Sequence, residues 1–219
     1  MIGDIALTEK GLEARGTGRV LVIACGALAR EILAIRDLNG LDHVDLHCLP
    51  AILHNHPDRI PDAVEQALTD RAGRYERAFV AYADCGTGGR LKATCDRLGV
   101  EMIAGPHCYA FFDGQDRFAA RDEIDAFYLT DFLARQFDAF VTVPLGLDRH
   151  PQLRDMYFGH YSRVVYLAQT DDPDLTARAR AAAEKLGLLF ERRATGYGEL
   201  SPIIRGLTGP PRGNVDKTG

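Results

Sequence analysis

The chain has 219 residues, of which 46% are hydrophobic and 26% are charged, with a formal net charge of −5 and a mean hydropathy of −0.14. This length suits one domain with a sizeable core, and no apolar run approaches the roughly 20 residues that cross a bilayer. The surplus of acidic residues disfavours a general surface for nucleic acid or anionic membrane, because neutralising phosphate requires concentrated lysine and arginine.

Residues 1–18 mix acidic and basic side chains, so they lack the basic start and apolar centre of a signal peptide. We therefore expect a soluble, cytoplasmic protein that begins with an N-terminal extension over 1–18. The chain has five cysteines, an odd number that cannot all pair within one chain. This favours reduced thiols over a disulfide framework.

Strands and helices alternate along the first half of the chain. Short apolar runs that end at glycine, proline or a polar turn predict strands, and apolar residues at helical spacing predict the helices between them. The predicted strands are 19–24, 44–49, 78–82 and 100–103, and the predicted helices are 27–35, 61–71 and 90–98.

In the second half, residues 109–138 are predicted to be mostly helical, with a weak strand over 140–143. A clearer unit follows. Its predicted elements are a strand over 163–167, a helix over 174–186 and a strand over 188–192. Glycine, proline and charge dominate 206–219, which is typical of a disordered tail.

This alternation predicts an α/β fold with right-handed crossovers. We expect a doubly wound, Rossmann-like architecture: a mainly parallel sheet with helices on both faces, forming a single domain over 19–205. Ligands bind such sheets at the carboxyl ends of the strands, where the strand-to-helix loops converge.

Three cysteines fall at those strand ends. Cys25 ends the first strand, Cys85 follows the third, and Cys108 follows the fourth, each in a turn with glycine close by. Thiolates suit zinc and iron–sulfur clusters, so the placement predicts one metal or metallocluster there, with His54 or His107 as a further ligand. The alternative is that these cysteines are simply small buried residues.

The remaining cysteines and histidines carry less weight. Cys48 lies inside a strand and Cys95 inside a helix, so both are interpreted as core residues. His56 is a weaker ligand candidate than His54, and His150 and His160 are interpreted as surface or capping residues.

A glycine-rich turn follows Cys85, and its members Gly86, Thr87, Gly88 and Gly89 could offer backbone N–H groups to a phosphate. The turn lacks the Lys-Ser/Thr ending of a P-loop and the full GxGxxG pattern. Asp84 and Glu31 are carboxylates near the cysteine turns, so they are candidate proton carriers or supports for the metal ligands.

Six segments together resemble the uncharacterised domain of unknown function family numbered 1638. They are Ala24-Cys25-Gly26-Ala27-Leu28, Leu49-Pro50 to Leu53-His54-Asn55-His56-Pro57, Asp84-Cys85-Gly86-Thr87-Gly88-Gly89, Gly105-Pro106-His107-Cys108-Tyr109, Phe127-Tyr128-Leu129-Thr130-Asp131-Phe132 and Leu147-Asp148-Arg149-His150-Pro151. The likeness runs from about residue 19 to residue 199. By their gene neighbours, members look like companions of corrinoid-dependent methyltransferases of the trimethylamine type, which implies a setting in one-carbon metabolism.

Three hypotheses follow. The leading one is a metal-binding protein of corrinoid-linked methyl-group metabolism, acting in methyl transfer or corrinoid reactivation on a small-molecule substrate or a corrinoid methyltransferase. The chain has no corrinoid-binding Asp-x-His-x-x-Gly motif, so it is not predicted to hold the corrinoid itself. The alternatives are a non-catalytic accessory protein or chaperone that docks on a methyltransferase, and a small-molecule or nucleotide-binding module that uses the glycine turn.

Overall fold

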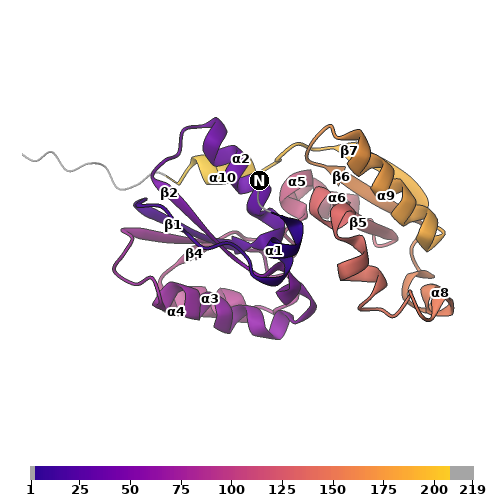
Figure 1. Cartoon of the computed structure of the whole chain (residues 1–219), viewed down its shortest axis with the longest axis horizontal. Coiled ribbons are helices and arrows are strands. Elements are labelled where there is room, and N and C mark those ends of the chain that lie inside the picture. The colour runs from indigo at the N-terminus through magenta and orange to yellow at the C-terminus, as the bar shows by residue number, and fades with distance from the viewer. Residues whose placement is uncertain (1–2, 208–219) are drawn as a thin grey trace, which may run out of the picture.

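The computed structural model describes residues 3–207, and its strands form two parallel sheets (Figure 1). The strand order is β2-β1-β3-β4 in the first sheet and β5-β6-β7 in the second, and every pairing between these strands is parallel. The strands are β1 (Val20–Cys25), β2 (Val44–Leu49), β3 (Arg77–Ala81), β4 (Glu101–Met102), β5 (Ala126–Thr130), β6 (Arg163–Ala168) and β7 (Leu189–Ala194). The predicted α/β class is confirmed, with the strands divided between two sheets.

Strand β1 is the centre of the first sheet, because it pairs with β2 on one side and β3 on the other. All six of its residues are buried, as expected for a parallel strand whose two faces are both covered. Figure 1 shows α2 and α10 on one face of this sheet and α3 and α4 on the other. These helices are α2 (Ala29–Leu38), α3 (Ile60–Thr69), α4 (Arg90–Leu98) and α10 (Leu200–Arg205).

The second sheet uses its two faces for two different cores. Along β6, Val164 and Tyr166 pack with the helices around that sheet, whereas Val165 and Leu167 join the core that contains β1 and β3. This shared core makes the two sheets parts of one domain. The remaining helices are α5 (Ala110–Asp113), α6 (Gln115–Arg121), α7 (Asp131–Arg135), α8 (Arg154–Phe158) and α9 (Pro173–Leu186). Within residues 3–207, no helix has both the length and the apolar character needed to cross a bilayer.

Both ends of the described chain pack onto the first sheet. Helix α1 (Asp4–Glu9) lies within the segment predicted as an extension, and its Leu7 is fully buried. After the second sheet, α10 crosses back to α2 and buries Leu200 and Ile204. Leu207, inside the predicted tail, is buried as well, whereas 208–219 lie outside the described residues.

The segment predicted to be mostly helical contains strand β5, and this part of the prediction was wrong. All but one residue of β5 are buried, so its apolar run shows no alternation that would distinguish a strand from a buried helix. The strand predicted over 140–143 is instead part of a π-helical turn over Asp138–Thr142. There the ring of Phe140 packs against Phe132, and this tertiary contact overrides the local strand preference.

Asp131 connects the end of β5 to the end of β6 inside the second sheet's core. It is 1% exposed, and its carboxylate accepts hydrogen bonds from the Tyr166 hydroxyl at 2.7 Å and from the backbone N–H groups of Gln169 at 3.0 Å and Thr170 at 3.1 Å. The Asp131 N–H in turn donates to the side-chain oxygen of Gln169 at 2.7 Å. One carboxylate therefore satisfies several buried donors.

Replacing this carboxylate should destabilise the protein strongly. We expect Asp131→Ala to lower the free energy of unfolding by about 3 kcal/mol, because buried donors lose their acceptor. Urea unfolding followed by circular dichroism measures the change. The matched control is Asp116→Ala on exposed α6, expected to stay within about 0.5 kcal/mol of the parent. Equal losses in the two variants would contradict this account.

Candidate three-thiol pocket

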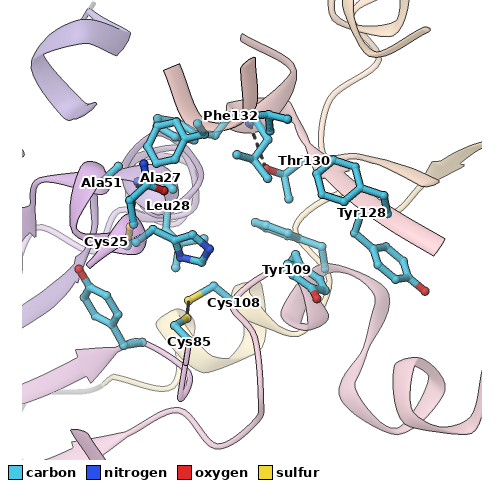
Figure 2. A pocket seen from close by; sticks show the side chains of 18 of the residues that line it. Cys25, Ala27, Leu28, Ala51, Cys85, Cys108, Tyr109, Tyr128, Thr130 and Phe132 are labelled. Carbon is cyan, nitrogen blue, oxygen red and sulfur yellow. Dashed lines mark hydrogen bonds between the residues drawn. The ribbon is translucent and has the colours of Figure 1, made fainter. Parts of the chain in front are cut away.

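A pocket of about 300 Å³ lies between the carboxyl ends of β1 and β3 in the first sheet and strand β5 of the second. Cys25 is the last residue of β1, Tyr82 directly follows β3, and Thr130 is the last residue of β5; all three line the pocket. Figure 2 shows Cys25, Cys85 and Cys108 with aromatic rings across from them. The described residues that line it include no lysine, arginine, aspartate or glutamate. Its lining therefore consists of thiols, rings and aliphatic groups, together with the uncharged polar side chains of Asn55 and Thr130.

Cys25 is held by the turn that begins at its own position. Its Sγ accepts a hydrogen bond from the Ala27 N–H at 3.5 Å and so caps the short 3₁₀ turn Gly26–Leu28. A side chain at Gly26 would place its Cβ 2.3 Å from the carbonyl oxygen of Leu7, which explains the glycine after the thiol. Burial raises the pKa of Cys25 to about 12, so the uncomplexed group is a thiol at neutral pH.

Cys85 and Cys108 form a close pair, with their sulfur atoms 3.0 Å apart (Figure 2). Two backbone hydrogen bonds join their loops, from the N–H of Asp84 to the carbonyl of Gly105 and from the N–H of Cys85 to the carbonyl of Pro106, both at 2.9 Å. The hydrogen bond from Cys108 lowers the pKa of Cys85, whereas this contact and burial raise the pKa of Cys108. Cys85 is therefore the sulfur of the pair that loses its proton more readily.

The glycine turn predicted to bind a cofactor holds the side chain of Asp84. The Asp84 carboxylate accepts hydrogen bonds from the N–H of Gly89 at 2.7 Å, the hydroxyl of Thr87 at 2.7 Å and the N–H of Gly88 at 3.1 Å. These bonds, led by the one from Gly89, lower the pKa of Asp84. None of the residues in Gly86–Gly89 lines the pocket. In the structure, this turn fixes the backbone next to the thiol pair.

The two histidines predicted as ligands differ in position. His54 lines the pocket, and burial lowers its pKa, which favours the neutral imidazole that metals require. His107 is not among the lining residues; its ring stacks on Tyr109 with centroids 4.9 Å apart. Of the two, His54 is the one that lines the pocket with the three cysteines.

Tyr82 is a lining residue that the sequence reasoning missed. Its side chain is 2% exposed, and its buried hydroxyl has no hydrogen-bond partner within the described chain. A buried hydroxyl without a partner is costly, so this group marks a place where a bound atom would gain a hydrogen bond.

A wall of aromatic rings was also missed, because it depends on β5. They come from α5 and the residue before it, from β5, from α7 and the π-helical turn after it, and from the end of α8 and the loop that follows. The members are Tyr109, Phe112, Phe127, Tyr128, Phe132, Phe140, Phe158 and Tyr161. The rings of Tyr109 and Tyr128 stack with centroids 5.3 Å apart. The wall gives the pocket an apolar half beside the thiols.

The structure brings Cys25, Cys85 and Cys108 to one pocket, as the strand placement predicts. Cys48 and Cys95 are buried in β2 and α4 and do not line it. As the side chains stand, no three His, Cys, Asp or Glu groups within residues 3–207 are arranged around a common metal position. The thiols thus share a cavity without forming a closed coordination shell.

Glu31 lies away from the pocket lining, buried between the two halves of the fold. It is 4% exposed, and one of its carboxylate oxygens has no hydrogen-bond partner in the described chain. Burial raises the pKa of Glu31 to about 7. The negative charge of Asp131 raises this pKa further, whereas the positive charges of Arg135 in α7 and Arg30 in its own helix lower it. Burial, with the charge of Glu31 as a further cause, raises the pKa of Tyr197. This carboxylate therefore titrates near neutral pH.

Fold and pocket define a parallel α/β protein with two sheets and a thiol-lined cavity between the carboxyl edge of the first sheet and strand β5 of the second. The chain belongs to the family of proteins of unknown function DUF1638, whose family model matches residues 48–204. This match includes Cys85, Cys108 and His54 and excludes Cys25. No curated protein and no solved structure matches the chain significantly.

The buried carboxylate of Glu31 should make stability depend on pH. Because its pKa rises from 4.5 to about 7 on folding, its charge opposes folding increasingly as pH rises from about 4.5 to about 7, and fully above that. We expect Glu31→Gln to raise the free energy of unfolding at pH 8 by about 3 kcal/mol and to change it little at pH 4.5. Thermal or urea unfolding at both pH values measures this.

The control is Glu184→Gln on the exposed face of α9, where we expect the same small difference at both pH values. If Glu31→Gln changed stability equally at pH 4.5 and pH 8, titration of this group could not be the cause.

Proposed function

We propose that this protein binds a thiophilic metal centre, either zinc or an iron–sulfur cluster, through the thiolates of Cys25, Cys85 and Cys108. The observation that carries the proposal is that three cysteines from separate loops line one pocket of about 300 Å³. His54 lines the same pocket and is the favoured fourth ligand; His107 would reach the centre only by leaving its stack on Tyr109.

The chemistry of the donors supports this proposal. Thiolate and neutral imidazole are the ligands that zinc and iron–sulfur clusters prefer, and the pocket lining offers no carboxylate to compete with them. A bound cation deprotonates a coordinating thiol, which overcomes the high pKa that burial gives Cys25. Binding of the metal therefore releases protons from the coordinating thiols.

The thiol pair needs only a small adjustment to bind a metal. Two sulfur ligands of a tetrahedral zinc, each about 2.3 Å from the metal, lie about 3.8 Å apart. The sulfurs of Cys85 and Cys108 are 3.0 Å apart. Loading therefore requires the pair to open by less than 1 Å, by about 0.8 Å on these distances, while Cys25 turns toward the same point.

The rest of the pocket supports a small, uncharged substrate. The aromatic wall can pack against an apolar or flat molecule, and the absence of charged lining groups leaves no partner for a phosphate or carboxylate. The unpartnered hydroxyl of Tyr82 can donate one hydrogen bond to a substrate atom. Zinc would activate a thiol or polarise a bound group, whereas a cluster would transfer electrons.

The setting we propose is corrinoid-linked methyl-group metabolism in the cytoplasm, with a corrinoid methyltransferase as partner. The resemblance of the motifs to a family found beside such methyltransferases supports the setting. The five cysteines are all free in the structure, which suits a reducing compartment. In this setting the centre would serve methyl transfer or the reductive reactivation of an oxidised corrinoid.

Metal analysis of the full chain tests this function. Protein purified without oxygen should contain close to one zinc, or the iron and sulfide of one cluster, per chain. Cys25→Ser, Cys85→Ser and Cys108→Ser should each lower the metal content at least about tenfold, because a hydroxyl is a poor ligand for a soft metal. The control Cys95→Ser alters a buried thiol outside the pocket and should keep the metal.

Metal-free protein whose three pocket thiols are all freely alkylated would contradict the proposal. If that protein still bound a corrinoid methyltransferase after replacement of the three cysteines, the alternative of a non-catalytic accessory protein would be favoured instead.

A further inference from the structure

Cys85 and Cys108 are placed to react with each other. Both are free, and their 3.0 Å contact is the one hydrogen bond between two sulfurs among residues 3–207. The other cysteines are engaged elsewhere: Cys25 caps its own turn, and Cys48 and Cys95 are buried in regular elements. An oxidation that joins two thiols of this chain is therefore expected to join Cys85 and Cys108.

The backbone around the pair is already fixed, so closing a bond between the sulfurs costs little chain entropy. The hydrogen bonds from the Asp84 and Cys85 N–H groups to the loop of Gly105 and Pro106 join the two segments. The Asp84 carboxylate holds the turn on the other side of Cys85. Cys85 itself has a φ of +48°, in the left-handed region that a cysteine rarely adopts. Such a backbone persists only where its surroundings impose it.

The pair can be reached by a small reagent. Cys108 is half-buried rather than fully buried, and both sulfurs belong to residues that line the pocket. A molecule that enters the pocket therefore meets the pair, whereas Cys95 is fully buried in α4.

We propose that Cys85 and Cys108 form a reversible disulfide with a low-molecular-weight disulfide as oxidant, and that this bond closes the metal site. In the first step, one cysteine loses its proton and its sulfur bonds to a sulfur of the small disulfide, whose S–S bond breaks and releases one thiolate. In the second step, the other cysteine loses its proton and attacks the mixed disulfide, which forms the protein S–S bond and releases the second thiolate. The chain gives up two electrons and two protons, and the small disulfide becomes two thiols.

The disulfide itself stands independently of the metal, whereas its regulatory role rests on the proposed function. Oxidation removes two of the three thiolate ligands, so only the reduced chain can load a thiophilic centre. A loaded centre in turn occupies both sulfurs and protects them from the oxidant. Metal content thereby becomes coupled to the thiol–disulfide balance of the compartment.

The test uses the full-length reduced chain in buffers of reduced and oxidised glutathione, followed by alkylation, intact mass and peptide mapping. We expect the loss of two hydrogen atoms, a cross-link between the peptides of Cys85 and Cys108, and recovery with dithiothreitol. The Cys95→Ser control should oxidise in the same way. A chain carrying both Cys108→Ser and Cys25→Ser should instead retain glutathione on Cys85, because no second thiol in the pocket can displace it.

A chain whose two thiols stay alkylatable in oxidised glutathione, or which cross-links a different pair, would overturn the proposal. Zinc binding to the reduced and oxidised forms, measured by competition with a chromophoric chelator, tests the regulatory role. We expect at least a tenfold loss of affinity on oxidation, and equal affinity would overturn that role. If the disulfide forms but the reduced chain binds neither zinc nor iron, the proposed function fails and the disulfide stands.

Discussion

Parallel pairing is the constraint from which the rest of the site follows. Because β1 pairs in parallel with both β2 and β3, and β5 with β6, every strand of a sheet ends at the same edge. At this edge of the first sheet lie Cys25 at the end of β1, Cys85 after β3 and Cys108 after β4, and the aromatic wall around β5 lines the same pocket. An antiparallel arrangement would have sent alternate loops to opposite edges and separated these thiols. The cavity is thus a consequence of topology, and its chemistry is a consequence of which residues stand at the strand ends.

Because residues of both sheets line the pocket, it depends on the relative position of the two sheets, and both ends of the described chain help to fix that position. Asp4 of α1 accepts hydrogen bonds from Arg30 of α2 at 3.1 Å and from Arg135 of α7 at 3.2 Å, so one carboxylate links a helix of each sheet. From the other end, α10 returns from the second sheet to pack on α2. The shared core of buried residues from β1, β3, β5 and β6 completes the connection.

The sequence predicted the features that depend on local residue patterns, but it did not predict those that depend on contacts between distant segments. Short apolar runs located six of the seven strands within residues 3–207, and a glycine close to each strand-end cysteine helped to locate the three thiols of the pocket. Strand β5 was missed because its apolar run resembles a buried helix segment. Tyr82 and the aromatic wall were missed with it, since their convergence depends on how the second sheet faces the first. The bonds from Gly88 and Gly89 to Asp84 could have been anticipated, because an aspartate just before a glycine turn often binds that turn's own N–H groups.

The central claim is that sulfur from the strand ends forms a metal centre in this pocket. X-ray absorption at the zinc or iron edge of the anaerobically purified chain tests it most directly, because the spectrum identifies the ligand atoms. The account predicts sulfur as the dominant neighbour at about 2.3 Å, with one lighter atom for a zinc site that includes His54. A spectrum with only nitrogen and oxygen neighbours would contradict it.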